Sequence, residues 1–87
     1  MGLRIQVATE ADCYAVLAAL HDRYAPVPDS QDDYIAHPKA NGYQSLHTAV
    51  RTPLGVAEFQ IRTPQMHAHA EHGGASHARY KAAQKVA

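Results

Sequence analysis

The start of the chain alternates between apolar and polar residues. Residues 3–7 read Leu-Arg-Ile-Gln-Val, a period of two that is typical of a half-buried β-strand. Thr9 and Asp12 follow with the spacing of a capping box, in which a hydroxyl begins a helix and an acid stands three residues later. The pattern therefore predicts a strand and then a helix that starts after Thr9.

The predicted helix has one apolar face. Its apolar residues recur at steps of three and four positions, as one side of an amphipathic helix requires. They are Cys13, Val16, Leu17, Leu20 and Tyr24. Pro26 and Pro28 follow, and we expect them to end the helix because proline lacks the backbone N–H that a helix needs.

The middle of the chain predicts a loop and then a hairpin. Residues 26–42 are rich in Pro, Asp, Gly and Asn, as loops are, and residues 34–36 within them could pair briefly as a short strand. Residues 45–50 and 56–61 alternate or nearly so, and the short connection between them around 53–55 predicts an antiparallel hairpin.

The last predicted element is a helix that starts at Thr63-Pro64, an N-cap followed by proline. Gly73-Gly74 interrupts its pattern. The resulting order, β-α-(β)-β-β-α, predicts an α/β (α+β) domain with a small mixed or antiparallel sheet and helices on one face. The whole chain, residues 1–87, is expected to form a single domain or part of one.

Composition narrows the possible functions. Eight basic and eight acidic residues cancel to a net charge of zero, which argues against a general binder of nucleic acid or of membrane surfaces. Cys13 is the only cysteine, so an intramolecular disulfide is excluded and a reducing compartment is favoured. With no apolar run long enough to span a membrane, the sequence predicts a cytoplasmic protein.

The loop that ends at Tyr43 holds side chains that could bind a nucleotide. They are Asp32, Asp33, Tyr34, Lys39, Asn41 and Tyr43. A tyrosine ring could stack on a base, an amide could bind its polar edge, a lysine could bind phosphate and acids could bind a cation. From composition alone, an ordinary surface loop with a turn at Asn41-Gly42 is the favoured interpretation.

Two further features allow a functional and a structural interpretation. Glu58 lies within a predicted strand, where it could serve as a positioned base or cation ligand, or simply point to solvent together with Gln60 and Arg62. The histidines between His67 and His77 could capture a metal. No recognised spacing supplies a third ligand there, so histidines at the surface or the core edge are favoured.

Several segments together resemble the RelA/SpoT-family (p)ppGpp synthetases. Residues 33–48 resemble the family's acceptor-nucleotide segment, with its Asn-Gly-Tyr-Gln-Ser-Leu-His-Thr run, and residues 58–63 resemble its Glu-x-Gln-Ile-Arg-Thr strand. Residues 66–81 follow its last helix. The resemblance extends over residues 3–81 and implies the family's nucleotidyltransferase-like fold, with residues 26–42 as the nucleotide-binding loop.

The resemblance implies an activity and a role for each matching residue. The family transfers the β,γ-pyrophosphate of ATP to the 3′-hydroxyl of GDP or GTP with Mg²⁺, in guanosine tetraphosphate metabolism and the stringent response. Tyr43 would stack on guanine, Asn41 would hold the nucleotide and Lys39 would face its phosphates. His47 and Gln44 would belong to the same acceptor site.

The resemblance also assigns the acids. Glu58 corresponds to the catalytic glutamate, which binds Mg²⁺ and activates the 3′-hydroxyl. Asp32 and Asp33 are closest to the acidic segment of the synthesis-only members, although Ser30 replaces its first acid. At Gly74 and Ala78 the family usually has a branched apolar residue and a tryptophan, so this chain departs from the pattern there.

Two hypotheses follow for the function. In the first, the chain is the acceptor half of a synthetase domain, and the isolated chain is expected to be inactive because the family's second Mg²⁺ ligand and its ATP-binding segment would precede residue 1. In the second, the chain is a non-catalytic module that binds guanine nucleotides or a protein partner. Pairing through an exposed sheet edge would make a homo-oligomer unsurprising in either case.

Overall fold

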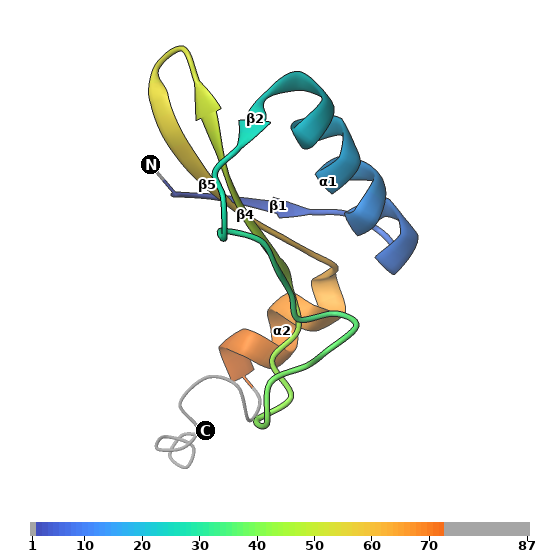
Figure 1. The fold of residues 1–87 in the computed structure, drawn as a ribbon. Coiled ribbons are helices and arrows are strands. Elements are labelled where there is room, and N and C mark those ends of the chain that lie inside the picture. Colours follow the sequence, from blue (N-terminus) through green and yellow to red (C-terminus); the bar gives the residue numbers. More distant parts are fainter. Residues whose placement is uncertain (1, 73–87) are drawn as a thin grey trace.

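The computed structural model describes residues 2–72 and contains a five-stranded mixed sheet and two helices. Figure 1 shows α1 lying along one face of the sheet and α2 at one end of it. The elements in chain order are β1 (Gly2–Gln6), α1 (Glu10–Arg23), β2 (Ala25–Pro26), β3 (Asp32–Asp33), β4 (Leu46–Thr52), β5 (Gly55–Arg62) and α2 (Pro64–His72). The mixed α+β class predicted from the sequence is therefore confirmed.

The sheet is built around the predicted hairpin. Strands β4 and β5 pair antiparallel, β1 adds to β5 in parallel, and β2 and β3 both pair antiparallel with β4. The hairpin turn closes because Thr52 Oγ1 accepts from Leu54 N and donates to Gly55 O. Gly55 has a φ of +117°, a backbone conformation that glycine adopts without steric cost.

Helix α1 begins and ends where its local chemistry requires. The Thr9 hydroxyl accepts from Asp12 N at 3.1 Å, so the predicted cap is confirmed. The helix ends at Arg23, and the Tyr24 N–H bonds to Leu20 O at 2.8 Å beyond its last turn. Pro26 then lies in β2, an edge strand, where its missing N–H is tolerated.

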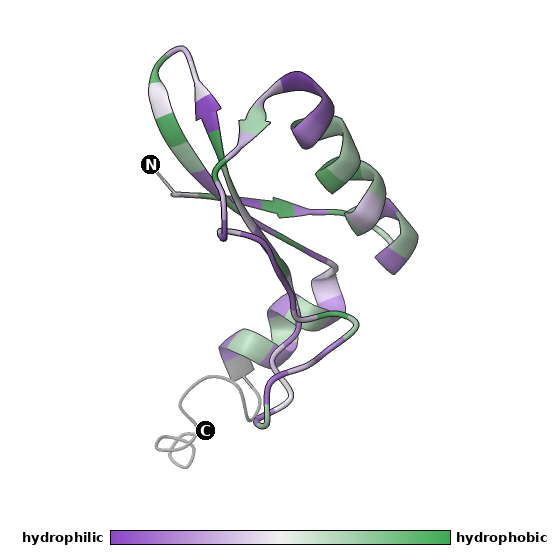
Figure 2. Cartoon of the chain, viewed as in Figure 1, coloured by the Kyte–Doolittle hydropathy of each residue, from purple (hydrophilic) through white to green (hydrophobic). Residues whose placement is uncertain are grey.

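The core lies between α1 and the sheet. Alternate residues of β4 and β5 point toward the helix, and Figure 2 shows hydrophobic and hydrophilic residues along both α1 and the sheet. The buried core residues in contact are Cys13, Ile35, Leu46, Ile61 and Met66. Met66 comes from α2, whose first turn is capped by Thr63 Oγ1 accepting from Met66 N. The predicted apolar stripe of α1 packs on this cluster through Val16, Leu17 and Leu20.

The short strand suggested for residues 34–36 is wrong. These residues form a turn, and the short strand is β3, immediately before them. The Asp33 carboxylate accepts from the backbone N–H groups of Ile35 and Ala36 at 3.0 and 2.9 Å. An acid that bonds the backbone two and three residues later favours a turn over an extended strand.

Two sequence expectations fall on residues that the structure does not describe. They are the interruption of the last helix at Gly73-Gly74 and the departures from the family pattern at Gly74 and Ala78.

Within residues 2–72, β1 and β2 end the sheet order, each bonded on one side. Oligomerisation through such an edge stays a prediction. No helix in this part of the chain is long and apolar enough to cross a membrane.

Candidate nucleotide site

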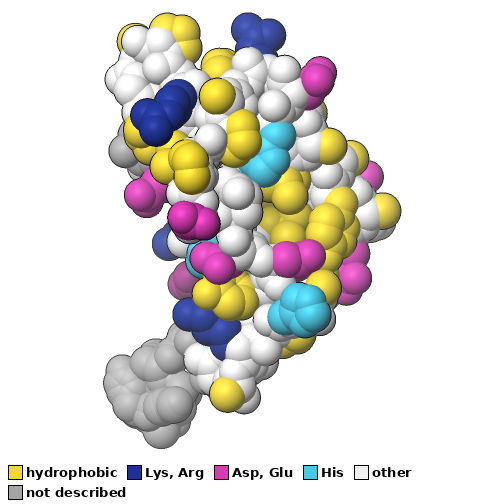
Figure 3. Space-filling model, in the orientation of Figure 1, with side chains coloured by type: hydrophobic (Ala, Val, Ile, Leu, Met, Phe, Trp, Pro, Cys, Tyr) yellow, Lys and Arg dark blue, Asp and Glu magenta, His cyan; other side chains and the backbone are white. Residues whose placement is uncertain are grey.

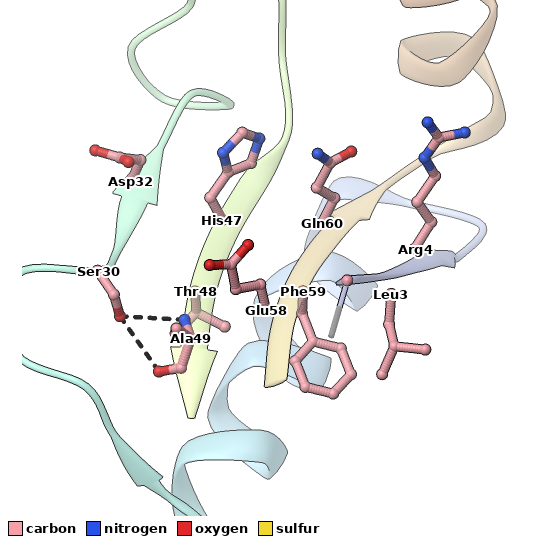
Figure 4. A pocket seen from close by; sticks show the side chains of 11 residues that line it. Leu3, Arg4, Ser30, Asp32, His47, Thr48, Ala49, Glu58, Phe59 and Gln60 are labelled. Carbon is pink, nitrogen blue, oxygen red and sulfur yellow. Dashed lines mark hydrogen bonds between the residues drawn. The ribbon is translucent and has the colours of Figure 1, made fainter. Parts of the chain in front are cut away.

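One row of polar side chains crosses the sheet on the face opposite α1, which we call the open face. In the strand register Asp32 pairs with His47, His47 with Gln60, and Gln60 with Arg4. Paired residues point to the same side of a pleated sheet. Figure 4 shows these four side chains extending to one side while Phe59 extends to the other. Four separate strands thus supply one polar surface.

Glu58 belongs to the neighbouring row on the same open face. Its register partners are Ala49 on β4 and Gly2 on β1. Because both neighbours are small, the carboxylate stands in an uncrowded position. It lines an open cavity of about 490 Å³ together with Asp32, His47 and Arg4, a volume in the range of small-ligand pockets. The structure therefore places Glu58 and His47 on one surface.

Tyr43 reaches this surface through His47. The Tyr43 hydroxyl and His47 Nε2 are hydrogen-bonded at 2.9 Å. The ring of Tyr34 packs edge-on against both, and Lys39 Nζ lies 4.9 Å from the Tyr34 ring centroid and 5.7 Å from that of Tyr43. The structure thus gathers three predicted binding residues, Tyr43, Lys39 and His47, around Tyr34.

Asn41 acts on the backbone of the same loop. Its Oδ1 accepts from Tyr43 N at 3.0 Å, while the backbone of Lys39 bonds to Gly42 N and to Tyr43 O. Gly42 has a φ of +88°, and a Cβ there would lie 3.0 Å from the imidazole of His69. The turn predicted at Asn41-Gly42 is confirmed, and it holds Lys39 and Tyr43 close together.

Two of the predicted site residues point elsewhere. Gln44 donates through Nε2 to Ile35 O at 3.1 Å and lines a second cavity between the starts of α1 and α2. Asp33 faces α1, where it accepts from the Tyr14 hydroxyl. Burial raises the pKa of the Asp33 carboxyl, but hydrogen bonds from Ala36 N, Tyr14 and Ile35 N outweigh burial and leave it below its ordinary value. Both residues support the loop.

The electrostatics of the open face centre on His47. Burial lowers the pKa of His47 below its ordinary value; Asp32 opposes this shift, and the cations of Lys39 and Arg62 reinforce it. A neutral imidazole has one donor and one acceptor nitrogen, and Nε2 already bonds the Tyr43 hydroxyl. The open face therefore combines one neutral ring with charges of both signs.

Arg62 is a charged residue of β5 whose burial was not predicted from the sequence. Alternation predicted that it would point to solvent beside Gln60, but its side chain is only 3% exposed. Its Nη2 donates to His67 Nδ1 at 2.9 Å, and its Nε has no partner among the described residues. The alternation places Arg62 on the open face correctly. Its cover comes from elsewhere in the fold, which the pattern does not encode.

Replacing Arg62 with methionine is expected to raise the stability of the unliganded protein. Among residues 2–72 the guanidinium has no carboxylate partner, and replacing a buried charged group by an apolar side chain of similar length can stabilise a protein by about 1–4 kcal/mol. Thermal unfolding of Arg62→Met should show a higher Tm, whereas Arg51→Met, on an exposed residue of β4, should change it little. A lower Tm for Arg62→Met would contradict this prediction and show that the buried guanidinium stabilises the fold.

The histidine tract does not converge on a metal site within the described residues. His67 bonds to Arg62, and His69 Nε2 lies 3.3 Å from Asn41 O. No group of three potential ligands occurs in residues 2–72, and His77 lies outside them. Acidic and basic side chains are interspersed over the face seen in Figure 3, so charge alone does not single out a binding surface there.

Comparison with known sequences identifies relatives over nearly the entire chain. Residues 1–85 match the model of the family described as a region found in RelA/SpoT proteins. The GTP pyrophosphokinase of Escherichia coli is 52% identical over 81 residues, and that of Streptomyces antibioticus is 54% identical over 82. These alignments cover 92% and 93% of this chain but only 11% and 10% of the relatives, so the chain spans about a tenth of their length.

Comparison with solved structures identifies synthetases of the same kind. The small alarmone synthetase 1 of Bacillus subtilis, bound to its product pppGpp, matches with a TM-score of 0.70 and 34% identity over 90% of this chain and 44% of the other. A GTP pyrophosphokinase family protein from Streptococcus pneumoniae matches with a TM-score of 0.65 and 32% identity, over 97% of this chain and 46% of that protein. The fold, the strand-borne glutamate and these matches together show that the chain belongs to the RelA/SpoT family.

Proposed function

We propose that this chain forms the acceptor-nucleotide side of a (p)ppGpp synthetase site. The observation that carries the proposal is that His47 and Glu58 line one cavity on the open face, and that the Tyr43 hydroxyl is hydrogen-bonded to His47 at its edge. A purine nucleotide needs an aromatic surface, cationic groups for phosphate and an acid near the sugar. The open face and its adjoining loop supply all three.

The acceptor nucleotide, GDP or GTP, would bind through its two ends. The Tyr43 ring would stack on guanine, and its bond to His47 would restrict how the ring turns. Lys39, whose ammonium group lies near both tyrosine rings, would face the phosphates. Asn41 would contribute by keeping the Lys39–Tyr43 turn closed. This arrangement supports the binding role that the family resemblance assigns to these residues.

Glu58 would act on the 3′-hydroxyl. In the transfer, the hydroxyl oxygen forms a bond to the β-phosphorus of ATP, the bond from that phosphorus to the bridging oxygen of AMP breaks, and the hydroxyl proton passes to a base. A sugar hydroxyl is a weak nucleophile at neutral pH, so a carboxylate on a rigid strand suits this task. The chain spans 44% of the small alarmone synthetase that it matches, so ATP would be bound in part by other segments of a complete synthetase. A complete protein of this kind would act in alarmone synthesis and the stringent response.

Magnesium fits the donor set on this face. Mg²⁺ is usually bound by one or two carboxylates together with substrate phosphates, and Glu58 and Asp32 both line the cavity. Glu58 is the residue that would hold the ion. When bound, Mg²⁺ would neutralise phosphate charge that the nearby Lys39 offsets only in part.

Titration with GDP tests the proposal. The wild type should bind GDP, and Tyr43→Ala should weaken binding by about 5- to 150-fold, the equivalent of 1–3 kcal/mol of lost stacking. Tyr24→Ala is a matched control because Tyr24 lies at the end of α1 and not on the open face. Equal GDP affinity in the wild type and Tyr43→Ala, measured by calorimetry, would refute the stacking role.

A further inference from the structure

We propose that Tyr34 is a positioning residue that selects phosphorylated nucleotides. Its ring holds the base-stacking tyrosine, the neighbouring imidazole and the phosphate-facing ammonium in one fixed arrangement, so that a ligand carrying both a base and phosphates is preferred over a nucleoside. The inference rests on the proposed function and deepens it. Tyr34 is not among the residues to which the family resemblance assigned a role.

The backbone at Tyr34 is anchored on both sides. The Tyr34 N–H donates to Ser45 O at 2.9 Å, at the entrance to β4. Ile35, the next residue, is buried in the core, and the preceding Asp33 carboxylate is tied to the Tyr14 hydroxyl of α1. A ring carried by such a segment has a defined position before any ligand arrives, which lowers the entropic cost of binding.

The ring of Tyr34 contacts three side chains at once. Its centroid is 6.0 Å from that of Tyr43 at an interplanar angle of 66°, and 5.3 Å from that of His47 at 83°. Both geometries are favourable edge-to-face arrangements. Lys39 Nζ lies 4.9 Å from the same centroid, within the range of a cation–π contact. Tyr43 also contacts His47 and Lys39, but the Lys39 ammonium lies closer to the Tyr34 ring, at 4.9 Å, than to the Tyr43 ring, at 5.7 Å.

The contacts assign the role to the aromatic ring and not to the hydroxyl. Among residues 2–72 no hydrogen bond involves the Tyr34 hydroxyl, whereas Tyr43 uses its own hydroxyl to hold His47. Lys39 is exposed and its side chain is long, so without the Tyr34 ring its ammonium group would sample many positions. This freedom of the ammonium group would weaken phosphate binding more than it would weaken base stacking.

The test compares GDP with guanosine in three proteins. Tyr34→Leu should weaken GDP binding by about tenfold and guanosine binding by much less, so that the preference for GDP falls, because it removes contacts of the cation–π and edge-to-face kind. Tyr34→Phe should keep wild-type affinity for both ligands. Unchanged preference in Tyr34→Leu, or loss of preference in Tyr34→Phe, would overturn the inference.

Lys39→Met keeps the test decisive if Tyr34→Leu is poorly folded. It changes an exposed side chain and should by itself lower the preference for GDP over guanosine. If Lys39→Met leaves the preference intact, Tyr34 cannot act through Lys39 and the inference fails.

A measurement without nucleotide separates this inference from the proposed function. The contacts of the Lys39 side chain with the Tyr43 ring can be measured by NMR in the wild type, Tyr34→Phe and Tyr34→Leu. Since Lys39 Nζ lies 5.7 Å from the Tyr43 ring centroid, Tyr34→Phe should keep these contacts and Tyr34→Leu should lose them. If the wild type bound no GDP, the proposed function would fail, and unchanged Lys39–Tyr43 contacts in Tyr34→Leu would refute the positioning role independently.

Discussion

Replacing Glu58 with glutamine is expected to lower pyrophosphate transfer by about 10²- to 10⁴-fold, the usual contribution of a positioned general base. The measurement needs a complete synthetase. Residues 2–72 would therefore replace the matching segment of the Escherichia coli GTP pyrophosphokinase, to which this chain is 52% identical over 81 residues. Glutamine keeps the size of the side chain but cannot accept the proton of the 3′-hydroxyl.

The result should separate chemistry from binding. Since Glu58 is exposed and its neighbours Ala49 and Gly2 are small, the substitution should leave folding and GDP affinity nearly unchanged. Glu10→Gln, an exposed acid at the start of α1, is the control and should retain full transfer. Comparable rates in Glu58→Gln and Glu10→Gln would contradict the catalytic role.

The hybrid synthetase that carries residues 2–72 without a substitution distinguishes the two hypotheses drawn from the sequence. If it transfers pyrophosphate from ATP to GDP, the chain carries a working acceptor half. If it binds GDP normally but transfers nothing, this segment is a guanine-nucleotide-binding module that has lost the reaction. Measuring ppGpp formation and GDP affinity on the same preparation separates these outcomes.

The second large effect concerns stability. Ile61→Ala is expected to destabilise the fold by about 2–5 kcal/mol, because it removes a fully buried branched side chain and leaves a cavity. Ile61 packs where β5, β4 and α1 meet, together with Leu46 and Cys13. Small domains are stable by only about 5–15 kcal/mol, so urea denaturation should show a much lower midpoint.

Val56→Ala provides the matched control for this loss. Val56 lies on the same strand, but its side chain is 44% exposed, and a truncation there should cost little because no cavity forms. Equal denaturation midpoints for Ile61→Ala and Val56→Ala would show that the contacts between α1 and the sheet do not carry the stability of the fold.

Local chemistry made the main elements predictable. The alternation in residues 3–7 and 45–61 placed β1 and the β4–β5 hairpin, and the Thr9 cap placed the start of α1. The strand suggested for residues 34–36 is wrong because these residues form a turn, and the turn places Ile35 in the core. Apolar character indicates burial, but over three residues it does not distinguish a strand from a turn whose hydrogen bonds come from a neighbouring aspartate.

The candidate site was predictable by residue type more than by geometry. The family resemblance named Tyr43, Lys39, His47 and Glu58, and the structure brings the first three together and sets Glu58 on the same surface. The resemblance could not show that the Gln44 side chain bonds within the loop. Gln44 immediately follows Tyr43, yet its amide bonds to a carbonyl nine positions earlier.

The sequence by itself determined β1, the β4–β5 hairpin, where α1 begins, and which side chains are able to bind a nucleotide. Only the tertiary structure decided which of them act together. The register of β3, β4, β5 and β1 aligns Asp32, His47, Gln60 and Arg4 across the open face, and the turn after β3 brings Tyr34 beneath Lys39. Strand pairing and ring packing join residues far apart in the chain, and their energies depend on distances that no local pattern records.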